Sequence, residues 1–259
     1  MFGAIIGDLA GSIYEYNQIK AVEKLDVKEL ICDKSFFSDD TILTMAILDS
    51  ILNNKSYEHN LKKYTKNHIN YKPNFTPYFN TTFSPGFIKW SNSNTIGNSI
   101  GNGAMMRISP VGYLFNTEKE VIENSELATI PSHNTKEAID SATIIALIIF
   151  YIRKGLDKEE IIKRLNLKIN YKQFTKFNMT CYDTIDNCLY ALFNSNSFED
   201  SIKKVISYGG DTDTNACIVG SMAEAMYGID ESLINKASQK IPIEFNNLLD
   251  KGYKKIKKV

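Results

Sequence analysis

The sequence predicts an all-α protein that folds as a single domain over residues 1–259. Hydrophobic residues recur at helical spacing in long segments, and several of these segments end at a glycine, which is a common helix stop. Alternating strand patterns with Asn-Gly or Asp-Gly turns are scarce, which disfavours a doubly wound sheet. The 259 residues, 43% of them hydrophobic, are enough to bury a core without disulfides or metal staples.

Five segments show the helical period most clearly. Each has Ser, Thr, Asp or Asn at or just before its start and hydrophobic residues three or four positions apart within it. They are Ser38–Asn54, Lys136–Gly155, Thr184–Ser195, Ser197–Gly210 and Asp213–Gly228. The first and the last of them are apolar on nearly every side, so we expect both helices in the core.

The stretch from Tyr71 to Gly103 differs from the rest because it lacks a helical period and is rich in Asn, Ser, Thr and Gly. Long irregular segments inside a compact domain are usually functional. We therefore expect this segment to be functional, with residues 71–98 at the rim of a binding site. Its aromatic side chains could stack on a ligand's base, although aromatic residues more often pack in a core.

The composition excludes several classes of protein. Thirty basic and thirty acidic residues give a formal net charge of +0, which argues against general attraction to nucleic acid or to anionic membranes. The four cysteines form no C-x-x-C pair, as expected for reduced thiols rather than a disulfide framework. The chain starts without the basic region of a signal peptide, and its longest apolar stretch, Ala142–Ile152, is shorter than the roughly 20 residues of a membrane span. We expect a cytoplasmic protein with no membrane partner and no stable nucleic-acid partner.

Two short segments place carboxylates and hydroxyls at the start of apolar helices: Ser38–Thr41 (SDDT) and Asp211–Thr214 (DTDT). One interpretation is helix capping, because Ser, Thr and Asp are favoured caps. One Asp or Ser per helix would satisfy that role, yet each segment has two carboxylates. Two anions about 5 Å apart repel by roughly 3 kcal/mol at an effective dielectric of about 20, whereas the helix dipole contributes about 0.3–1 kcal/mol.

A bound divalent cation would offset this repulsion. Carboxylate and hydroxyl oxygens are hard ligands, which favour Mg²⁺, Mn²⁺ or Ca²⁺ over zinc or copper. For either segment alone, capping and metal binding are equally good interpretations. The presence of both segments in one chain favours a shared metal centre.

A third candidate lies at the N-terminus, where Gly3, Gly7 and Gly11 recur every fourth residue and form one bare helix face. Glycine within a helix costs roughly 1 kcal/mol relative to alanine, so we expect a close approach along this face. Asp8 and Glu15 lie two helical turns apart and point to similar sides. The alternative is a tight helix crossing with both acids on the surface, which leaves Glu15 unexplained.

The glycine-rich segment Ser99–Arg107 is a candidate anion site. Glycines at 97, 101 and 103 would allow backbone N–H groups to face outward as a nest for a phosphate. A plain turn explains the loop equally well. The segment lacks the Lys-Ser/Thr ending of a P-loop and the strand that precedes a dinucleotide-binding loop.

Five segments follow one another along the chain: Gly7–Glu15 (GDLAGSIYE), Ser38–Thr41 (SDDT), Gly101–Arg107 (GNGAMMR), His133 within PSHNTKEAIDSA, and Gly209–Ala216 (GGDTDTNA). Together they resemble the ADP-ribosylglycohydrolase family, which includes dinitrogenase-reductase-activating glycohydrolase and the ADP-ribosyl-acceptor hydrolases. The resemblance implies an orthogonal all-α bundle with a central cleft that holds two divalent cations, usually Mg²⁺ or Mn²⁺. It also implies a metal-dependent hydrolase that cleaves the C1″ glycosidic bond of ADP-ribosylated protein or small-molecule substrates and releases ADP-ribose.

The resemblance also implies the site residues by position. One cation would be held by Ser38, Asp39, Asp40 and Asp213, and the other by Asp211, Asp213, Thr214 and, in some members, Glu15. The substrate's diphosphate and distal ribose would bind at Ser99, Ile100, Gly101, Asn102, Gly103, Ala104 and Met105, with His133 at the rim. The catalytic carboxylates would be Glu15, Asp39 and Asp40, which would assist at C1″ or orient the attacking water. By itself, a lone His at a helix boundary is more often a cap or a surface residue.

Other functions share parts of this pattern. An inactive ADP-ribose-binding module of the same fold is the main alternative, although every expected ligand residue is present. Haloacid-dehalogenase-like phosphatases have an Asp-x-Asp-x-Thr motif, but theirs follows an apolar strand early in an α/β domain. Prenyl-transfer enzymes have Asp-rich metal motifs at a helical spacing that Asp39-Asp40 lacks. The sequence leaves open the acceptor (arginine, serine, a base or an ester), Mg²⁺ or Mn²⁺, the division of roles among the catalytic carboxylates, and the oligomeric state.

Overall fold

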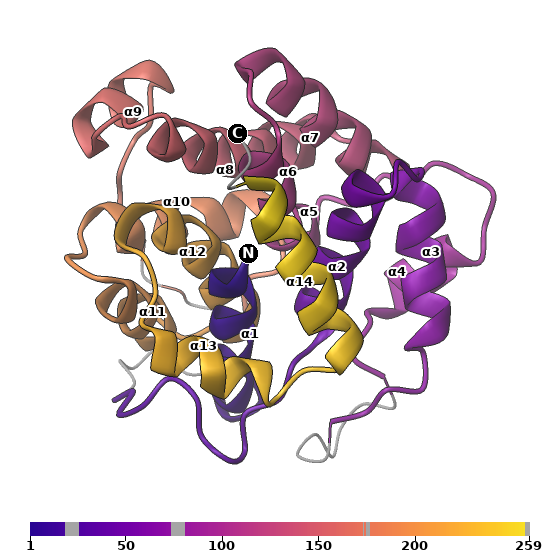
Figure 1. Ribbon diagram of the computed structural model, residues 1–259, viewed down its shortest axis with the longest axis horizontal. Coiled ribbons are helices and arrows are strands. Elements are labelled where there is room, and N and C mark those ends of the chain that lie inside the picture. Colours follow the sequence, from indigo (N-terminus) through magenta and orange to yellow (C-terminus); the bar gives the residue numbers. More distant parts are fainter. Residues whose placement is uncertain (19–25, 74–80, 173, 175–176, 257–259) are drawn as a thin grey trace.

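Helices form the regular structure of the part of the chain that the computed structural model describes, namely residues 1–18, 26–73, 81–172, 174 and 177–256 (Figure 1). The predicted all-α class is confirmed. In chain order the helices are α1 (Phe2–Gln18), α2 (Asp39–Leu52), α3 (Tyr57–Asn67), α4 (Pro85–Ser91), α5 (Gly103–Met106), α6 (Ser109–Leu114), α7 (Glu118–His133), α8 (Lys136–Arg153), α9 (Lys158–Arg164), α10 (Cys181–Phe193), α11 (Phe198–Ser207), α12 (Thr212–Tyr227), α13 (Glu231–Ser238) and α14 (Ile243–Ile256). Extended pairing among these residues is limited to two isolated bridges, Asn98–His133 and Gly101–Thr180.

The five segments predicted as helices are α2, α8, α10, α11 and α12. Helix α10 begins at Cys181, three residues before the predicted start. The Thr180 side chain accepts a hydrogen bond from the Asp183 amide and therefore caps the helix at this earlier position.

The prediction of an irregular stretch from Tyr71 to Gly103 is wrong for Pro85–Ser91, which forms α4. The Ser84 hydroxyl accepts a hydrogen bond from the Phe87 amide, and Pro85 occupies the first turn, both typical of a helix start. Trp90 alone is buried in this short helix, so the segment has no hydrophobic period. Residues 74–80, which include several of the aromatic side chains of this stretch, lie outside the described residues.

The N-terminal glycine face packs directly against α12 (Figure 1). A Cβ atom on Gly7 would overlap the carbonyl oxygen of Ala216, and one on Gly11 would overlap that of Thr212. The Thr212 hydroxyl donates a hydrogen bond of 2.8 Å to the Gly11 carbonyl. The expected close approach is confirmed, and it brings the acids of α1 beside the start of α12.

The starts of α2 and α12 lie in the interior of the protein. All residues from Thr212 to Ala223 in α12 are buried, and so are all residues from Asp40 to Leu48 in α2. The polar residues that begin these helices are therefore shielded from water together with the apolar turns that follow. Within the described ranges, no helix has both the length and the hydrophobicity to cross a membrane.

Gly7→Ala should destabilise the protein although alanine is favoured over glycine by about 1 kcal/mol within a helix. The methyl group would overlap backbone of α12, and overpacking of a core typically costs about 1–3 kcal/mol. In a domain of this size, each 1 kcal/mol lowers the melting temperature by about 2–4 °C. Thermal unfolding followed by circular dichroism measures the difference.

Gly86→Ala is the matched control, because a Cβ atom on Gly86 would meet nothing within 4 Å. We expect its melting temperature to equal or slightly exceed that of the wild type. A Gly7→Ala variant as stable as the wild type would contradict the close contact between α1 and α12.

Candidate functional site

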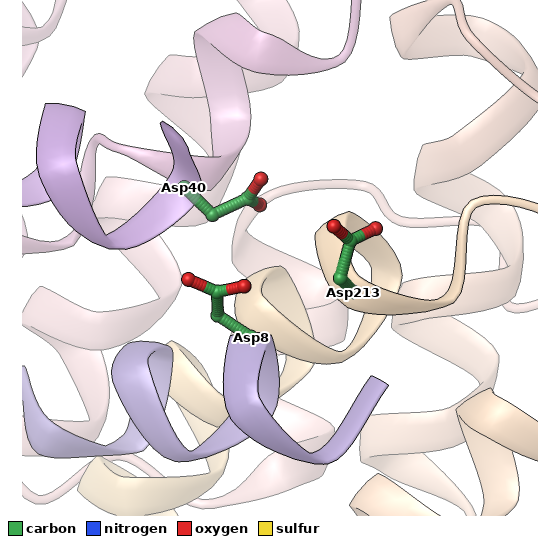
Figure 2. Close-up of side chains that lie close together, drawn as sticks. All are labelled: Asp8, Asp40 and Asp213. Carbon is green, nitrogen blue, oxygen red and sulfur yellow. The ribbon is translucent and has the colours of Figure 1, made fainter. Parts of the chain in front are cut away.

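Three helices bring carboxylates together in the interior. Oxygen atoms of Asp8, Asp40 and Asp213 lie within 4.8 Å of one another, and a second group with the same spacing comprises Glu15, Asp211 and Asp213. Figure 2 shows Asp8, Asp40 and Asp213 pointing toward one another from α1, α2 and α12. Asp213 belongs to both groups, so the two sets of carboxylates form one continuous cluster.

The start of α2 is capped by a hydroxyl and not by its acids. Ser38 is the N-cap, and its Oγ accepts a hydrogen bond from the Asp40 amide. The Asp40 carboxylate instead accepts hydrogen bonds at Oδ2 from the hydroxyls of Ser38 (3.1 Å) and Thr214 (3.3 Å). The Asp39 carboxylate is half-buried and accepts one from the Thr82 hydroxyl. Capping therefore explains Ser38 and leaves both carboxylates available for another role.

At the start of α12, too, the acid does not cap the helix. Asp211 occupies the N-cap position, but its side chain makes no capping hydrogen bond. Its carboxylate accepts a hydrogen bond of 2.6 Å from the Asn102 side chain, and its amide donates to the Asn178 side chain. Gly210, at φ +76°, admits this contact because a Cβ atom there would overlap Asn178 Oδ1. The capping interpretation thus fails for Asp211 as well.

Asp8 is a member of the cluster that was not predicted as a ligand from the sequence. Its Oδ2 accepts hydrogen bonds from the Ser38 amide (2.9 Å), the Thr41 amide (3.1 Å) and the Thr41 hydroxyl (2.5 Å). Asp8 is fully buried and ties α1 to the start of α2. The signal in the sequence was its place beside Gly7, on the helix side shared with Glu15.

Burial raises the pKa of all five aspartates of this region. The pKa of Asp8 rises to about 6, and those of Asp39 and Asp211 rise to about 7. The pKa values of Asp40 and Asp213 lie well above the ordinary value because the charges of neighbouring carboxylates add to burial. Positive charge nearby would therefore favour the ionised form of these side chains, above all of Asp40 and Asp213.

The donor set fits a divalent cation. Asp8 Oδ1 and Asp40 Oδ1 are buried and have no hydrogen-bond partner among the described residues, and an unsatisfied buried oxygen of this kind is costly. Both belong to a group of carboxylates close enough to share one ion. Oxygen ligands of this type suit Mg²⁺, Mn²⁺ or Ca²⁺. The central cleft that the resemblance implies stays a prediction.

The loop that carries the predicted substrate residues contacts this cluster at Asn102. The Asn102 side chain links the loop of residues 99–103 to Asp211, and the Asn98–His133 bridge holds the loop against the end of α7. Ser99 and Ile100 are exposed, whereas Ala104 and Met105 are completely buried.

The predicted nest of outward N–H groups is only partly present. The Gly101 amide donates to Ser99 Oγ, and the Asn102 amide donates to the Met179 carbonyl. Among the described residues, the amides of Ile100 and Gly103 have no internal acceptor. The ring of His133, which is buried and not at the surface, faces the loop: a Cβ atom on Gly101 or Gly103 would lie 3.6 or 3.7 Å from its Nε2.

Comparison with known proteins shows which family and which fold the chain matches. A family model described as ADP-ribosylglycohydrolase matches residues 1–250. The ADP-ribosylarginine hydrolase Tri1 of Pseudomonas putida is 29% identical over 145 residues, which cover 50% of this chain and 39% of that protein. Human ADP-ribosylhydrolase ARH3 is 19% identical over an alignment that covers 88% of this chain and 84% of its own length. A solved structure, an ADP-ribosylglycohydrolase-related protein complex, superposes with a TM-score of 0.71 at 16% identity over 98% of this chain and 95% of that one, which shows a shared fold.

In the presence of a chelator, the melting temperature should fall as the pH rises from 5 to 8. The folded-state pKa of Asp8 is about 6 and those of Asp39 and Asp211 are about 7, whereas an unfolded aspartate titrates near ~4. Between these values the folded protein holds more protons than the unfolded chain. Protonation therefore stabilises the folded state at low pH, and that stability is lost as the pH rises through the folded-state values.

Saturating Mn²⁺ should reduce this dependence, because a bound cation replaces the protons. Asp40→Asn removes one interacting carboxylate and should flatten the chelator curve. Burial lowers the pKa of His133, which works in the opposite direction, so the comparison of variant with wild type isolates the carboxylates. Equal slopes for Asp40→Asn and the wild type in chelator would contradict the mutual repulsion of this cluster.

Proposed function

The chain belongs to the ADP-ribosylglycohydrolase family, and we propose that it is a metal-dependent hydrolase that cleaves the C1″ glycosidic bond of ADP-ribosylated substrates and releases ADP-ribose. The observation that supports this proposal most directly is the pair of carboxylate groups that share Asp213. They lie beside a loop connected to them through the hydrogen bond from Asn102 to Asp211. A metal site and a candidate diphosphate site are thus neighbours.

We assign two divalent cations, Mg²⁺ or Mn²⁺, to this cluster. Ser38, Asp39, Asp40 and Asp213 would hold one ion, and Asp211, Asp213, Thr214 and Glu15 the other. When bound, such cations polarise water and the hydroxyls of a sugar. Asp8 keeps its hydrogen bonds to Ser38 and Thr41 through Oδ2, which fix the start of α2, while its Oδ1 has no partner among the described residues and the carboxylate belongs to the first group. Its role is to hold the neighbouring ligands in place.

The carboxylates differ in their access to a substrate. Asp40 is 2% exposed and is held by two hydroxyls, which suits a ligand. Glu15 and Asp39 are partly exposed, so they are the carboxylates that can face the ribose. Cleavage of a glycosidic bond passes through an oxocarbenium-like state, which a carboxylate stabilises and which needs a proton acceptor for the attacking water. We assign these two tasks to Glu15 and Asp39.

The loop of residues 99–103 is the proposed site for the diphosphate and distal ribose. The free amides of Ile100 and Gly103 and the ring of His133 are its donors toward such a ligand. The exposed position of Ser99 and Ile100 leaves the loop open to solvent, as a protein-linked substrate requires.

A working enzyme is a better interpretation than a binding-only module. Every carboxylate expected of a two-cation centre is present, and those of the two groups lie close together, all of them buried except the partly exposed Glu15. Simple binding of ADP-ribose would not require such a costly concentration of negative charge.

Purified protein should release ADP-ribose from at least one ADP-ribosylated substrate in a panel of arginine-, serine-, base- and ester-linked forms. Arginine-linked material is the first choice, since one relative is named an ADP-ribosylarginine hydrolase. Chelator should abolish release, and Mn²⁺ or Mg²⁺ should restore it. Asp213→Ala should reduce release at least about a hundredfold, because Asp213 serves both groups and its loss removes charge stabilisation worth several kcal/mol.

Chromatographic quantification of free ADP-ribose measures these rates, and a thermal melt confirms that the variant is folded. Undiminished turnover in chelator would contradict the metal requirement. Tight binding of ADP-ribose without turnover on any linkage would favour the binding module.

Asp40→Asn and Glu15→Gln should separate binding of metal from chemistry. Asp40→Asn should weaken Mn²⁺ binding at least about tenfold, because a buried ligand is lost. Glu15→Gln should bind the more tightly held Mn²⁺ ion like the wild type but lower kcat by about 10²–10⁴, the usual contribution of a general acid or base. Calorimetric Mn²⁺ titration and steady-state kinetics provide the two measurements, and a Glu15→Gln variant with normal kcat would exclude the catalytic role.

A further inference from the structure

A fully buried arginine lies beneath the glycine-rich loop. Arg107, directly after α5, is 1% exposed, and among the described residues it forms no ion pair. Its guanidinium lies over the ring of Phe87 in α4, with Cζ 5.6 Å from the ring centroid. A buried charge without a carboxylate partner is expensive, so its other contacts need an explanation.

Those contacts are with the last two residues of α7. Arg107 Nη2 donates a hydrogen bond of 2.7 Å to Ser132 Oγ and lies 3.4 Å from His133 Nδ1. Ser132 Oγ is also 2.7 Å from His133 Nδ1. The three side chains are buried, with Ser132 at 2% and His133 at 4% exposed.

The chemistry of these groups determines where the protons lie. A guanidinium can only donate, so Ser132 Oγ accepts from Arg107. The hydroxyl proton of Ser132 is then directed at His133 Nδ1, and a guanidinium N–H faces the same nitrogen. A nitrogen that faces two donors must be the acceptor, so the proton of the neutral imidazole is on Nε2. Burial and the charge of Arg107 keep the pKa of His133 well below its ordinary value, so the ring is neutral at physiological pH.

The Nε2 atom faces the part of the loop where donors are few. A Cβ atom on Gly101 or Gly103 would lie closer to Nε2 than to any other atom of the ring. The amides of Gly101 and Asn102 are already used within the protein, which leaves the Ile100 and Gly103 amides. A fixed N–H at Nε2 would add a donor at this place, and an acceptor nitrogen there would instead repel an oxygen-rich ligand.

We propose that Arg107 and Ser132 are positioning residues that hold His133 as the neutral Nε2–H tautomer, so that its ring donates a hydrogen bond to an oxygen of the ligand bound over Gly101–Gly103. The identity of that ligand, a nucleoside diphosphate sugar, rests on the proposed function. The arrangement of the protons does not, because it follows from contacts among the protein's own side chains.

Nuclear magnetic resonance of histidine labelled with ¹⁵N tests the tautomer directly. The chain has three histidines, His59, His68 and His133, so a His133→Gln spectrum assigns the third by difference. In the wild type at pH 7 without ligand, we expect Nδ1 of His133 to resonate as an unprotonated nitrogen and Nε2 as a protonated one. A protonated Nδ1, or an imidazolium at this pH, would overturn the proposal.

Two variants of Ser132 separate the hydroxyl from simple packing. Ser132→Ala removes the donor to Nδ1 and should give a mixture of tautomers, whereas Ser132→Thr retains a hydroxyl and should keep Nε2–H. Melting temperatures identify loss of fold in either variant. A Ser132→Ala spectrum identical to that of the wild type in a folded protein would contradict the positioning role of Ser132.

Calorimetric titration with ADP-ribose tests the donor. A glutamine amide places an N–H close to the position of Nε2, whereas an asparagine amide does not reach it. His133→Gln should therefore bind ADP-ribose within about threefold of the wild type, and His133→Asn about three- to tenfold more weakly than His133→Gln, the usual effect of one hydrogen bond. Equal affinities for the two variants would overturn the donor role. A wild type with the expected tautomer that fails to bind ADP-ribose would contradict the proposed function and leave the proton arrangement supported.

Discussion

Repulsion among buried carboxylates is the constraint that shapes the centre of this protein. Asp213 belongs to both groups of acids, and burial together with neighbouring carboxylates raises the pKa values of Asp40 and Asp213 well above the ordinary value, so that their ionised form needs positive charge nearby. The repelling carboxylates lie at the starts of α2 and α12, and the turns that follow in both helices are apolar and buried. Hydroxyl and amide donors from several elements hold the carboxylates in fixed directions, so the cluster is ordered by the protein and does not have to be assembled by its ligand.

The close contact between α1 and α12 makes this concentration of charge possible. Without side chains at Gly7 and Gly11, the two backbones approach until the Thr212 hydroxyl bonds to the Gly11 carbonyl. Asp8 and Glu15 thereby reach the same region as the acids of α12. Asp8 then fixes α2 through the amides of Ser38 and Thr41. Helix α1, which has no side chains at Gly7 and Gly11 where it faces α12, thus orients the starts of α2 and α12, which carry the other acids.

The sequence predicted what depends on local chemistry. The helices that begin at Asp39 and Thr212, the glycine face of α1 and the paired acids were all visible as motifs, because caps, glycines and apolar turns leave a local pattern. Features that depend on packing were not visible. Asp8 contributes because α1 crosses the start of α2, which no spacing along the chain reveals. The nest expected at residues 99–103 is only partly present, because the Asn102 amide donates a hydrogen bond to the Met179 carbonyl. Helix α4 was not predicted, because Trp90 is the one residue of this helix that is buried.

The hydrogen bond from the Asn102 side chain to Asp211 ties the glycine-rich loop to the acid cluster. Anything that neutralises Asp211 alters the strength of this bond, and anything that displaces the loop alters the environment of Asp211. Thermodynamic linkage is reciprocal, so the proposed cation and the proposed loop ligand would influence each other's affinity by the same factor. In the proposed enzyme, Asn102 would thus make ion uptake and occupation of the loop a cooperative pair, in which the order of arrival affects the kinetics but not the final equilibrium.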